Sequence, residues 1–137
     1  MNNDTMKSAG LLILRLIFGF VMIMHGIQKV FEWTPAGTIA SFEQMGIPMA
    51  TAAAYFAMAT ELLGGTIIIL GAGTRIAAVA SVVSMSGALI FVHLAAGFSA
   101  SKGGYEYVLT LAAVAATLAL TGAGKFSVDA LVTARRK

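Results

Sequence analysis

Four ionisable side chains near the ends of apolar segments could do chemistry together. They come from three separate stretches of the chain and are His25, Lys29, His93 and Glu106. At a helical rise of about 1.5 Å per residue, all four project to roughly 7 to 13 Å from the centre of the apolar segments, on the same side. Histidine and glutamate transfer protons, and lysine supplies positive charge. This pattern predicts a polar pocket with these four as catalytic and binding residues and Tyr105 as a further binding residue.

A quinone head group suits these residues better than a metal or a haem. Its carbonyl oxygens accept hydrogen bonds from histidine or lysine, its two protons need a relay, and its tail needs apolar helix surface. Two histidines and a carboxylate could bind a metal, but no local spacing such as His-x-x-x-His is present, and Lys29 near His25 would repel a cation. A haem would need His25 and His93 to face each other. We therefore expect a quinone, with haem and metal left open.

Two further charges lie deeper in the apolar segments. Arg15 falls within the run LLILRLIFGFVMIMHGIQKV, and Glu61 lies near the middle of the second run. An arginine in such a run costs at least about 2.5 kcal/mol to insert and rarely lacks a partner. By helical rise, Arg15 lies about 7 Å from the centre, an offset that its long side chain can cover. We therefore expect a structural ion pair between Arg15 and Glu61.

Four long apolar segments must position these side chains. The 137 residues are 58% hydrophobic and only 11% charged, whereas soluble domains have about 25% charged residues. Helices are expected over about 8–30, 49–70, 76–96 and 105–121, near the length that spans a bilayer. The predicted fold is all-α, a polytopic membrane four-helix bundle forming a single integral membrane domain over 1–137. The absence of cysteine excludes disulfides and thiolate chemistry.

One face of the first helix is expected to pack inside the bundle. At 100° per residue, one line along this helix gathers Arg15, Gly19, Met22, Gly26 and Lys29. Small residues beside charged ones are typical of close contacts between membrane helices rather than of lipid contact. The partners of these charges should therefore come from the other helices.

The distribution of positive charge predicts the orientation. One side of the membrane receives Lys7, Arg75, Lys125, Arg135, Arg136 and Lys137, and the other receives only Lys29 and Lys102. The positive-inside rule then places both termini in the cytoplasm. Between the first two helices, residues 39–45 are amphipathic and predict a short interfacial helix on the outer side. Because the positive charge lies in loops and ends, the lipid bilayer is the expected partner and nucleic acid is not.

Taken together, these motifs resemble the DoxX family. The residues that carry the resemblance are Arg15 followed by His25-Gly26-x-x-Lys29, Gly46-Ile47-Pro48, Glu61-x-x-Gly64-Gly65, His93, Gly103-Gly104-Tyr105-Glu106 and Gly124-Lys125-Phe126-Ser127-Val128-Asp129. The resemblance covers about residues 10–130. It implies a multi-pass, four-helix protein of the bacterial inner membrane. It also implies an association with quinol oxidase or thiosulfate:quinone oxidoreductase, or with oxidative and quinone stress.

Two functions follow from the residues and the resemblance. The first is a membrane subunit of a redox system, such as a quinone-linked oxidoreductase, that contacts quinone through the outer polar pocket. The alternative is a non-catalytic membrane anchor or scaffold that recruits a soluble oxidoreductase. A small-solute transporter is disfavoured because the chain shows no inverted repeats or broken helices. The redox partner, soluble or membrane-bound, and homo-oligomer formation are left open.

Overall fold

Within residues 2–135, which the computed structural model describes, all regular secondary structure is helical. The four long helices are, in chain order, α1 (Asn3–Ile27) continued by η1 (Gln28–Glu32); α3 (Ala50–Ala59) continued by η2 (Thr60–Gly64) and α4 (Gly65–Leu70); α5 (Thr74–Ala88) continued by η3 (Leu89–His93) and η4 (Leu94–Ala96); and α6 (Glu106–Thr121). The short helices are α2 (Thr34–Gln44), η5 (Ala100–Lys102) and α7 (Val128–Arg135).

All four predicted long helices are present, and the largest change is at the start of the first. This helix begins at Asn3 because the side chain of Asn2 accepts hydrogen bonds from the backbone N–H groups of Asp4 and Thr5. Such an N-cap satisfies donors that have no partner within the helix. The predicted helix near residues 39–45 is longer than expected and begins at Thr34, with Pro35 in its first turn.

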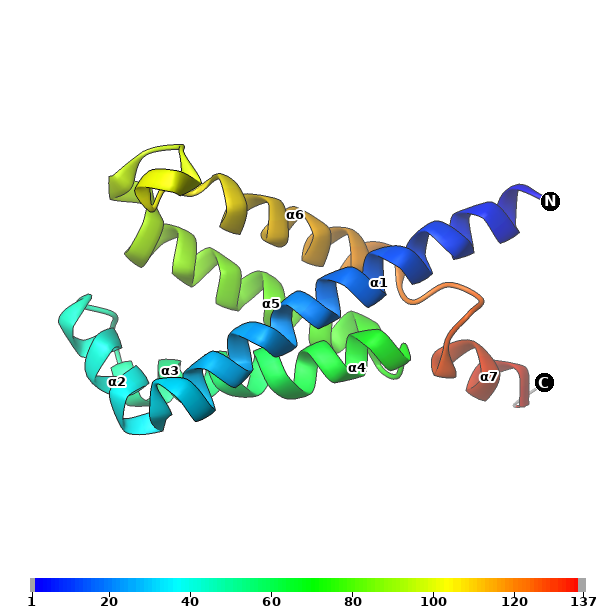
Figure 1. Cartoon of the computed structure of the whole chain (residues 1–137). Helices are drawn as coiled ribbons and strands as arrows, with labels where there is room; N and C mark the ends of the chain where they lie inside the picture. Colours follow the sequence, from blue (N-terminus) through cyan, green and yellow to red (C-terminus); the bar gives the residue numbers. More distant parts are fainter. Residues whose placement is uncertain (1, 136–137) are drawn as a thin grey trace.

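The C-terminal helix α7 was not predicted. Ser127 provides its N-cap, because the Ser127 hydroxyl accepts a hydrogen bond of 3.1 Å from the backbone N–H of Ala130. The carboxylate of Asp129 accepts from the backbone N–H groups of Gly73 and Thr74 at 2.7 and 3.2 Å. These bonds fasten α7 to the turn between α4 and α5, at the same end of the molecule as the N-terminus (Figure 1).

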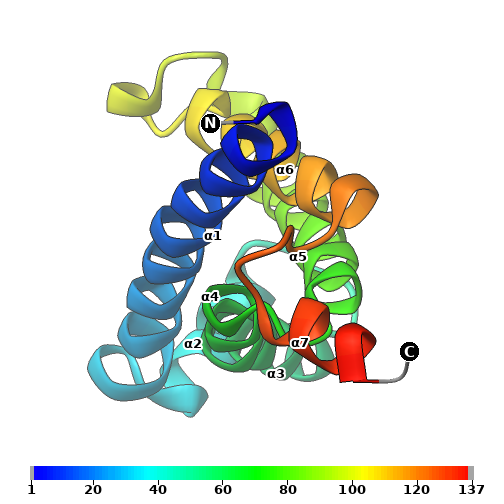
Figure 2. The same ribbon diagram turned by 90° about the vertical axis from the view of Figure 1, so that its right-hand side faces the viewer.

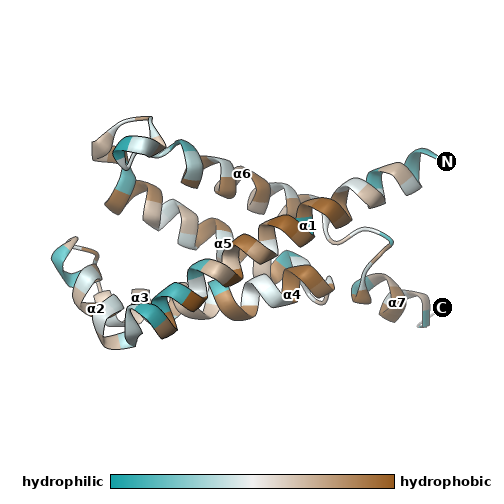
Figure 3. Ribbon diagram, viewed as in Figure 1, coloured by the Kyte–Doolittle hydropathy of each residue, from teal (hydrophilic) through white to brown (hydrophobic). Residues whose placement is uncertain are grey.

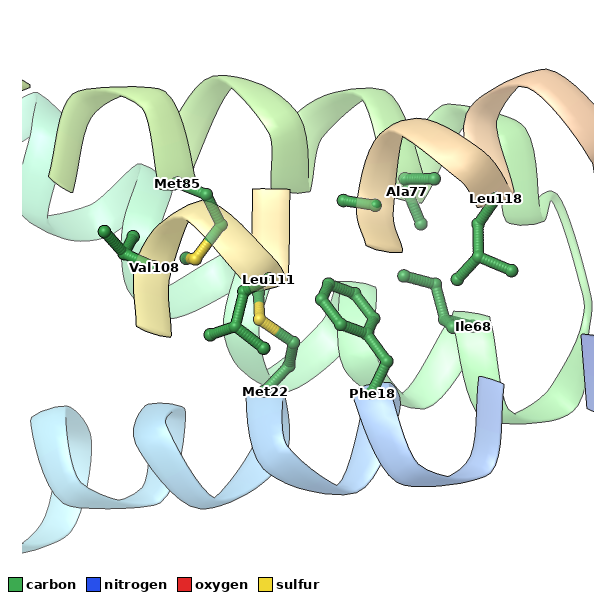
Figure 4. Close-up of a cluster of buried hydrophobic side chains, with 10 residues drawn as sticks. Phe18, Met22, Ile68, Ala77, Met85, Val108, Leu111 and Leu118 are labelled. Atoms are coloured by element: carbon green, nitrogen blue, oxygen red, sulfur yellow. The ribbon is translucent and has the colours of Figure 1, made fainter. Parts of the chain in front are cut away.

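The long helices pack as a ring. Helix α1 packs against α4 and η2, α4 against α5, α5 against α6, and α6 against α1. Viewed end-on, α7 lies at the near end beside α4 (Figure 2). Buried apolar side chains from all four helices meet in the centre (Figure 4): Phe18, Met22, Ile68, Ala77, Ala78, Met85, Val108, Leu111, Ala115 and Leu118. The fold is therefore a four-helix bundle with one continuous core.

Close contact between two glycines sets the register of α1 against α4. A Cβ atom on Gly19 would lie 2.7 Å from the backbone oxygen of Gly65, and one on Gly65 would lie 2.9 Å from the oxygen of Gly19. The next contact along this interface places Gly26 against Leu62. The predicted inner face of the first helix is thus confirmed, since small residues let the two backbones approach.

The predicted ion pair between Arg15 and Glu61 is wrong. The Arg15 guanidinium is buried and donates hydrogen bonds of 2.7 to 2.9 Å to the backbone oxygens of Ile68, Ile69, Ala123 and Phe126. The glycine register places Arg15 beside the end of α4, whereas Glu61 lies seven residues before Ile68. Seven residues correspond to about 10 Å along a helix.

Arg15 closes the end of the bundle where both termini lie. The last turn of α4 leaves backbone oxygens without partners inside the helix, and two of these oxygens accept from Arg15. The chain then turns at Gly71, whose φ of +69° suits glycine. A Cβ there would lie 2.6 Å from an Arg15 nitrogen, so the turn also needs glycine for space.

Three of the helices are long and apolar enough to cross a bilayer. These spans are Asn3–Glu32, Ala50–Leu70 and Thr74–Ala96, and α6 is a shorter apolar helix of 16 residues. Many large apolar side chains on their outer surfaces are exposed, as lipid-facing residues are expected to be. Hydropathy colouring shows the apolar middle of α1 and its hydrophilic end next to α2 (Figure 3).

Candidate functional site

Three π-helical turns interrupt three of the long helices, and each carries an ionisable side chain. Lys29 lies in η1, Glu61 in η2 and His93 in η3. In η1 the backbone N–H of Trp33 donates to the oxygen of Gln28, five residues earlier, at 2.8 Å. A π-turn inserts a residue into an α-helix, which turns the following side chains, and such turns are frequent at functional sites. All three side chains line the same cavity.

Lys29 and Glu61 form an ion pair between η1 and η2. Lys29 Nζ donates to Glu61 Oε1 at 2.8 Å, and the two side chains are 14% and 5% exposed. Lys29 Nζ also lies 5.7 Å from the centre of the Trp33 ring, within the range of a cation–π contact. The register that moves Arg15 away from Glu61 brings Lys29 to it. The positive charge that Lys29 was expected to supply to the predicted pocket therefore has a carboxylate partner.

The other oxygen of Glu61 has no partner. Glu61 Oε2 is buried and accepts no hydrogen bond from the part of the chain that the structure describes. Leaving a buried polar atom unsatisfied costs roughly 1 to 3 kcal/mol, and more for a charged group. An unsatisfied acceptor on a side chain that lines a cavity is where a ligand with a hydrogen-bond donor would gain most.

The cavity has a volume of about 550 Å³, within the range of small-molecule sites. Its lining is mostly apolar, with aromatic side chains from four segments: Trp33, Phe42, Phe56 and Phe91. The polar groups are few and are His25, Gln28, Lys29, Glu61, Ser84 and His93. An apolar cavity with a few convergent polar groups is typical of a site for a small organic molecule.

Helix α2 covers part of this cavity and is held by a side-chain hydrogen bond. The Thr38 hydroxyl donates to the backbone oxygen of Lys29 at 2.9 Å, and Thr38 is buried. From α2 and the turn after it, Phe42, Met45 and Ile47 contribute apolar surface to the lining. The polar connection between the first two long helices is thus part of the site.

The two histidines line the cavity from two different helices. His25 comes from the last turns of α1, and its ring centre lies 6.1 Å from that of Tyr107 on α6. His93 Nδ1 lies 2.8 Å from the backbone oxygen of Gly103. A carbonyl oxygen only accepts, so Nδ1 carries a proton, and the neutral ring has Nε2 as its acceptor.

Two residues of the predicted pocket lie elsewhere. The Glu106 carboxylate accepts a hydrogen bond from the backbone N–H of Ala100 and lines a separate shallow hollow with Tyr107. Tyr105 packs edge-on against Phe98, with ring centres 5.7 Å apart. The prediction that Glu106 shares a cavity with the histidines is wrong, because the loop before α6 folds back onto this carboxylate.

Residues 2–135 bring no group of three His, Asp or Glu side chains close enough to hold a metal ion. The acidic and imidazole groups of the cavity are Glu61, His25 and His93, and Lys29 occupies one oxygen of the carboxylate. This donor set suits a ligand that makes hydrogen bonds. Sequence reasoning assigned Glu61 to a structural ion pair and so missed its place in this cavity. The signal that could have found it is Lys29, the residue that pairs with Glu61 and that follows His25 by four positions.

The fold defines a small helical membrane protein with a mostly apolar cavity between its helices. The chain matches the family model described as DoxX over residues 10–94, and it belongs to the DoxX family. No solved structure matches the chain.

The chain is also similar to three curated proteins. The chain is 36% identical over 128 residues to Bacillus subtilis CatD, which is provisionally named an oxidoreductase; the match covers 93% of this chain and 90% of CatD. It is 39% identical over 83 residues to an uncharacterised membrane protein of Mycobacterium tuberculosis, covering 61% of this chain and half of that protein. It is 30% identical over 134 residues to an uncharacterised protein of Haemophilus influenzae, covering 94% and 96%.

Proposed function

We propose that the cavity binds the head group of a quinone or quinol and that the protein is a membrane component of a redox system. One observation carries this proposal. Three π-turns on three helices bring Lys29, Glu61 and His93 to one mostly apolar cavity. Helices that only anchor a partner have no need for three such irregular turns around a buried ion pair.

The residues of the cavity fit the chemistry of such a head group. Its ring is flat and apolar on both faces, which suits the aromatic side chains Trp33, Phe42 and Phe56. Its two oxygens need hydrogen-bond partners, and Lys29 has N–H donors beyond the one used on Glu61. Its tail is apolar, and exposed side chains at the cavity, such as Val83 and Phe91, provide matching surface.

A quinone supplies two-electron, two-proton redox chemistry when bound. The chain supplies positioning and proton exchange. Lys29 would donate to a ring oxygen, and Glu61 would hold the Lys29 ammonium in place. His93, fixed through Nδ1 by Gly103, would exchange a proton at Nε2. The provisional naming of CatD as an oxidoreductase supports a redox role.

The proposed orientation places the cavity toward the outer face of the bacterial inner membrane. Lys7, Arg75 and Lys125 lie at the end of the bundle that carries both termini. There the backbone N–H of Lys125 donates a hydrogen bond to Ser8 Oγ. The positive-inside rule makes this end cytoplasmic. Helix α2 would then lie in the outer interface, with Trp33 at the level of the head groups.

A binding titration in detergent tests the function. Short-tail ubiquinone and menaquinone analogues are added to the wild type and to His25→Ala, Lys29→Met, Glu61→Gln and His93→Ala. Lys102→Met and Glu43→Gln are matched controls, because they change the same groups at exposed positions. We expect saturable binding that weakens at least tenfold in the cavity variants and persists in the controls. Absence of binding between about pH 5 and 8, where imidazole changes charge, would instead favour an anchor for a soluble oxidoreductase.

A further inference from the structure

The buried ion pair offers a ligand one group that only donates and one that only accepts. The Lys29 ammonium donates hydrogen bonds and cannot accept them. Glu61, paired with that ammonium at 2.8 Å, is a carboxylate and accepts only. Its Oε2 is buried with no donor among residues 2–135, and its side chain lines the cavity.

The two redox forms of a quinone differ in what they offer to these groups. The oxidised form carries two carbonyl oxygens, which only accept. The reduced form carries two hydroxyls, and each hydroxyl both donates and accepts. Lys29 can therefore serve either form. Glu61 can bind only a hydroxyl, and a carbonyl beside it would set one acceptor against another.

We propose that the site binds the reduced, dihydroxy form of its ligand in preference to the oxidised form and that Glu61 makes this selection. This proposal rests on the function proposed above. A ring hydroxyl donates to the unpaired oxygen of Glu61, while Lys29 donates to a ligand oxygen in both redox states. Glu61 is thus a specificity-determining residue rather than a structural charge.

The preference has an expected size. A hydrogen bond to a charged group corresponds to roughly a tenfold to hundredfold difference in affinity. Tighter binding of the reduced form stabilises it, so the bound couple has a higher reduction potential than the free one. For a two-electron couple, each factor of ten is about 30 mV.

The experiment measures the dissociation constants of both redox forms of one short-tail analogue under anaerobic conditions. For the wild type, we expect the reduced form to bind at least tenfold more tightly. Glu61→Gln should lose most of this difference, because an amide both donates and accepts, and Glu43→Gln should keep it. The potential of the bound couple, titrated with mediators, should rise in the wild type and in Glu43→Gln only.

Equal affinity for both forms in the wild type, or tighter binding of the oxidised form, would overturn the selection by Glu61. The proposal that the cavity binds a quinone would be unaffected by that result. Absence of binding by either form would overturn the proposed function and the selection together. If Glu61→Gln fails to fold, the double variant Lys29→Met/Glu61→Leu replaces it, and a retained preference there would contradict the role of Glu61. The measurement on the wild type tests the preference itself, and the variants test whether Glu61 is its source.

Discussion

The buried cationic side chains of this protein have two kinds of partner, backbone oxygens and a carboxylate. Arg15 donates to four backbone oxygens, two from the end of α4 and two from the segment before α7. Lys29 has the carboxylate of Glu61. The planar guanidinium of an arginine offers five donors, whereas an ammonium acts as a point charge. Arg15 therefore joins two segments to α1 through their backbones, and Lys29 forms a single side-chain pair between two helices that lines the cavity.

Removing one member of the Lys29–Glu61 pair should destabilise the protein more than removing both. Lys29→Met leaves a buried carboxylate without its ion partner, and breaking such pairs costs about 3 to 5 kcal/mol. In Lys29→Met/Glu61→Leu the buried charge is gone, and most of the loss should be recovered. Thermal unfolding in detergent measures both variants beside Lys102→Met. A Lys29→Met protein as stable as Lys102→Met would show that the pair does not contribute to stability.

At the scale of single residues, sequence reasoning identified most of the charged residues that matter but assigned them the wrong partners. His25, Lys29 and His93 do line one cavity, as their shared level predicted. The partners of Arg15 could not be predicted, because backbone oxygens have no sequence signature. Glu106 was misplaced for a similar reason: its partner is the backbone N–H of Ala100. The catalytic roles assigned to these residues stay predictions.

At the scale of elements, the contact of α1 with α4 decides which charges meet. Gly19 and Gly65 hold the two helices at backbone contact, and this fixes Lys29 opposite Glu61. The π-turns act on the same pairing, since each adds one residue and turns the side chains beyond it. Sequence periodicity at 100° per residue assumes uninterrupted α-helices, so neither the register nor these turns could be derived from it.

A single methyl group at this contact should be enough to disturb it. Gly19→Ala would place a Cβ 2.7 Å from the Gly65 oxygen, and overpacking of this kind costs about 1 to 3 kcal/mol. Gly10→Ala is the matched control on the same helix, because its Cβ would meet nothing within 4 Å. The control should gain about 0.5 to 1 kcal/mol from the better helix former. Equal melting temperatures for both variants would contradict the close contact.

At the scale of the whole molecule, the two ends of the bundle differ in structure. One end holds both termini, Arg15 and α7, which hydrogen bonds join to the turn at Gly71–Gly73. The other end holds α2, and the cavity extends from there to η2, near the middle of its helix. The number of long helices and their approximate bounds were predictable, because long apolar runs separated by glycine and proline are strong signals. Helix α7 was not predicted because tertiary hydrogen bonds, rather than a local sequence pattern, attach it to the bundle.

The orientation of these ends can be measured by labelling single cysteines, since the chain has none of its own. Lys102→Cys lies at the cavity end and Lys125→Cys at the end with the termini. If the positive-inside rule holds, a membrane-impermeant maleimide should label Lys102→Cys in intact cells and Lys125→Cys only after permeabilisation. The reverse pattern would place the cavity on the cytoplasmic side.

The most direct test of the central claim is to locate the bound head group. A short-tail azidoquinone is photolysed with the purified protein, and mass spectrometry identifies the labelled residues. We predict labels within residues 25–61 and 83–93, which contain the lining of the cavity, and their loss when unlabelled analogue is in excess. Labels confined to residues 98–110 around Glu106, or labels that unlabelled analogue does not displace, would contradict a quinone site at Lys29 and Glu61.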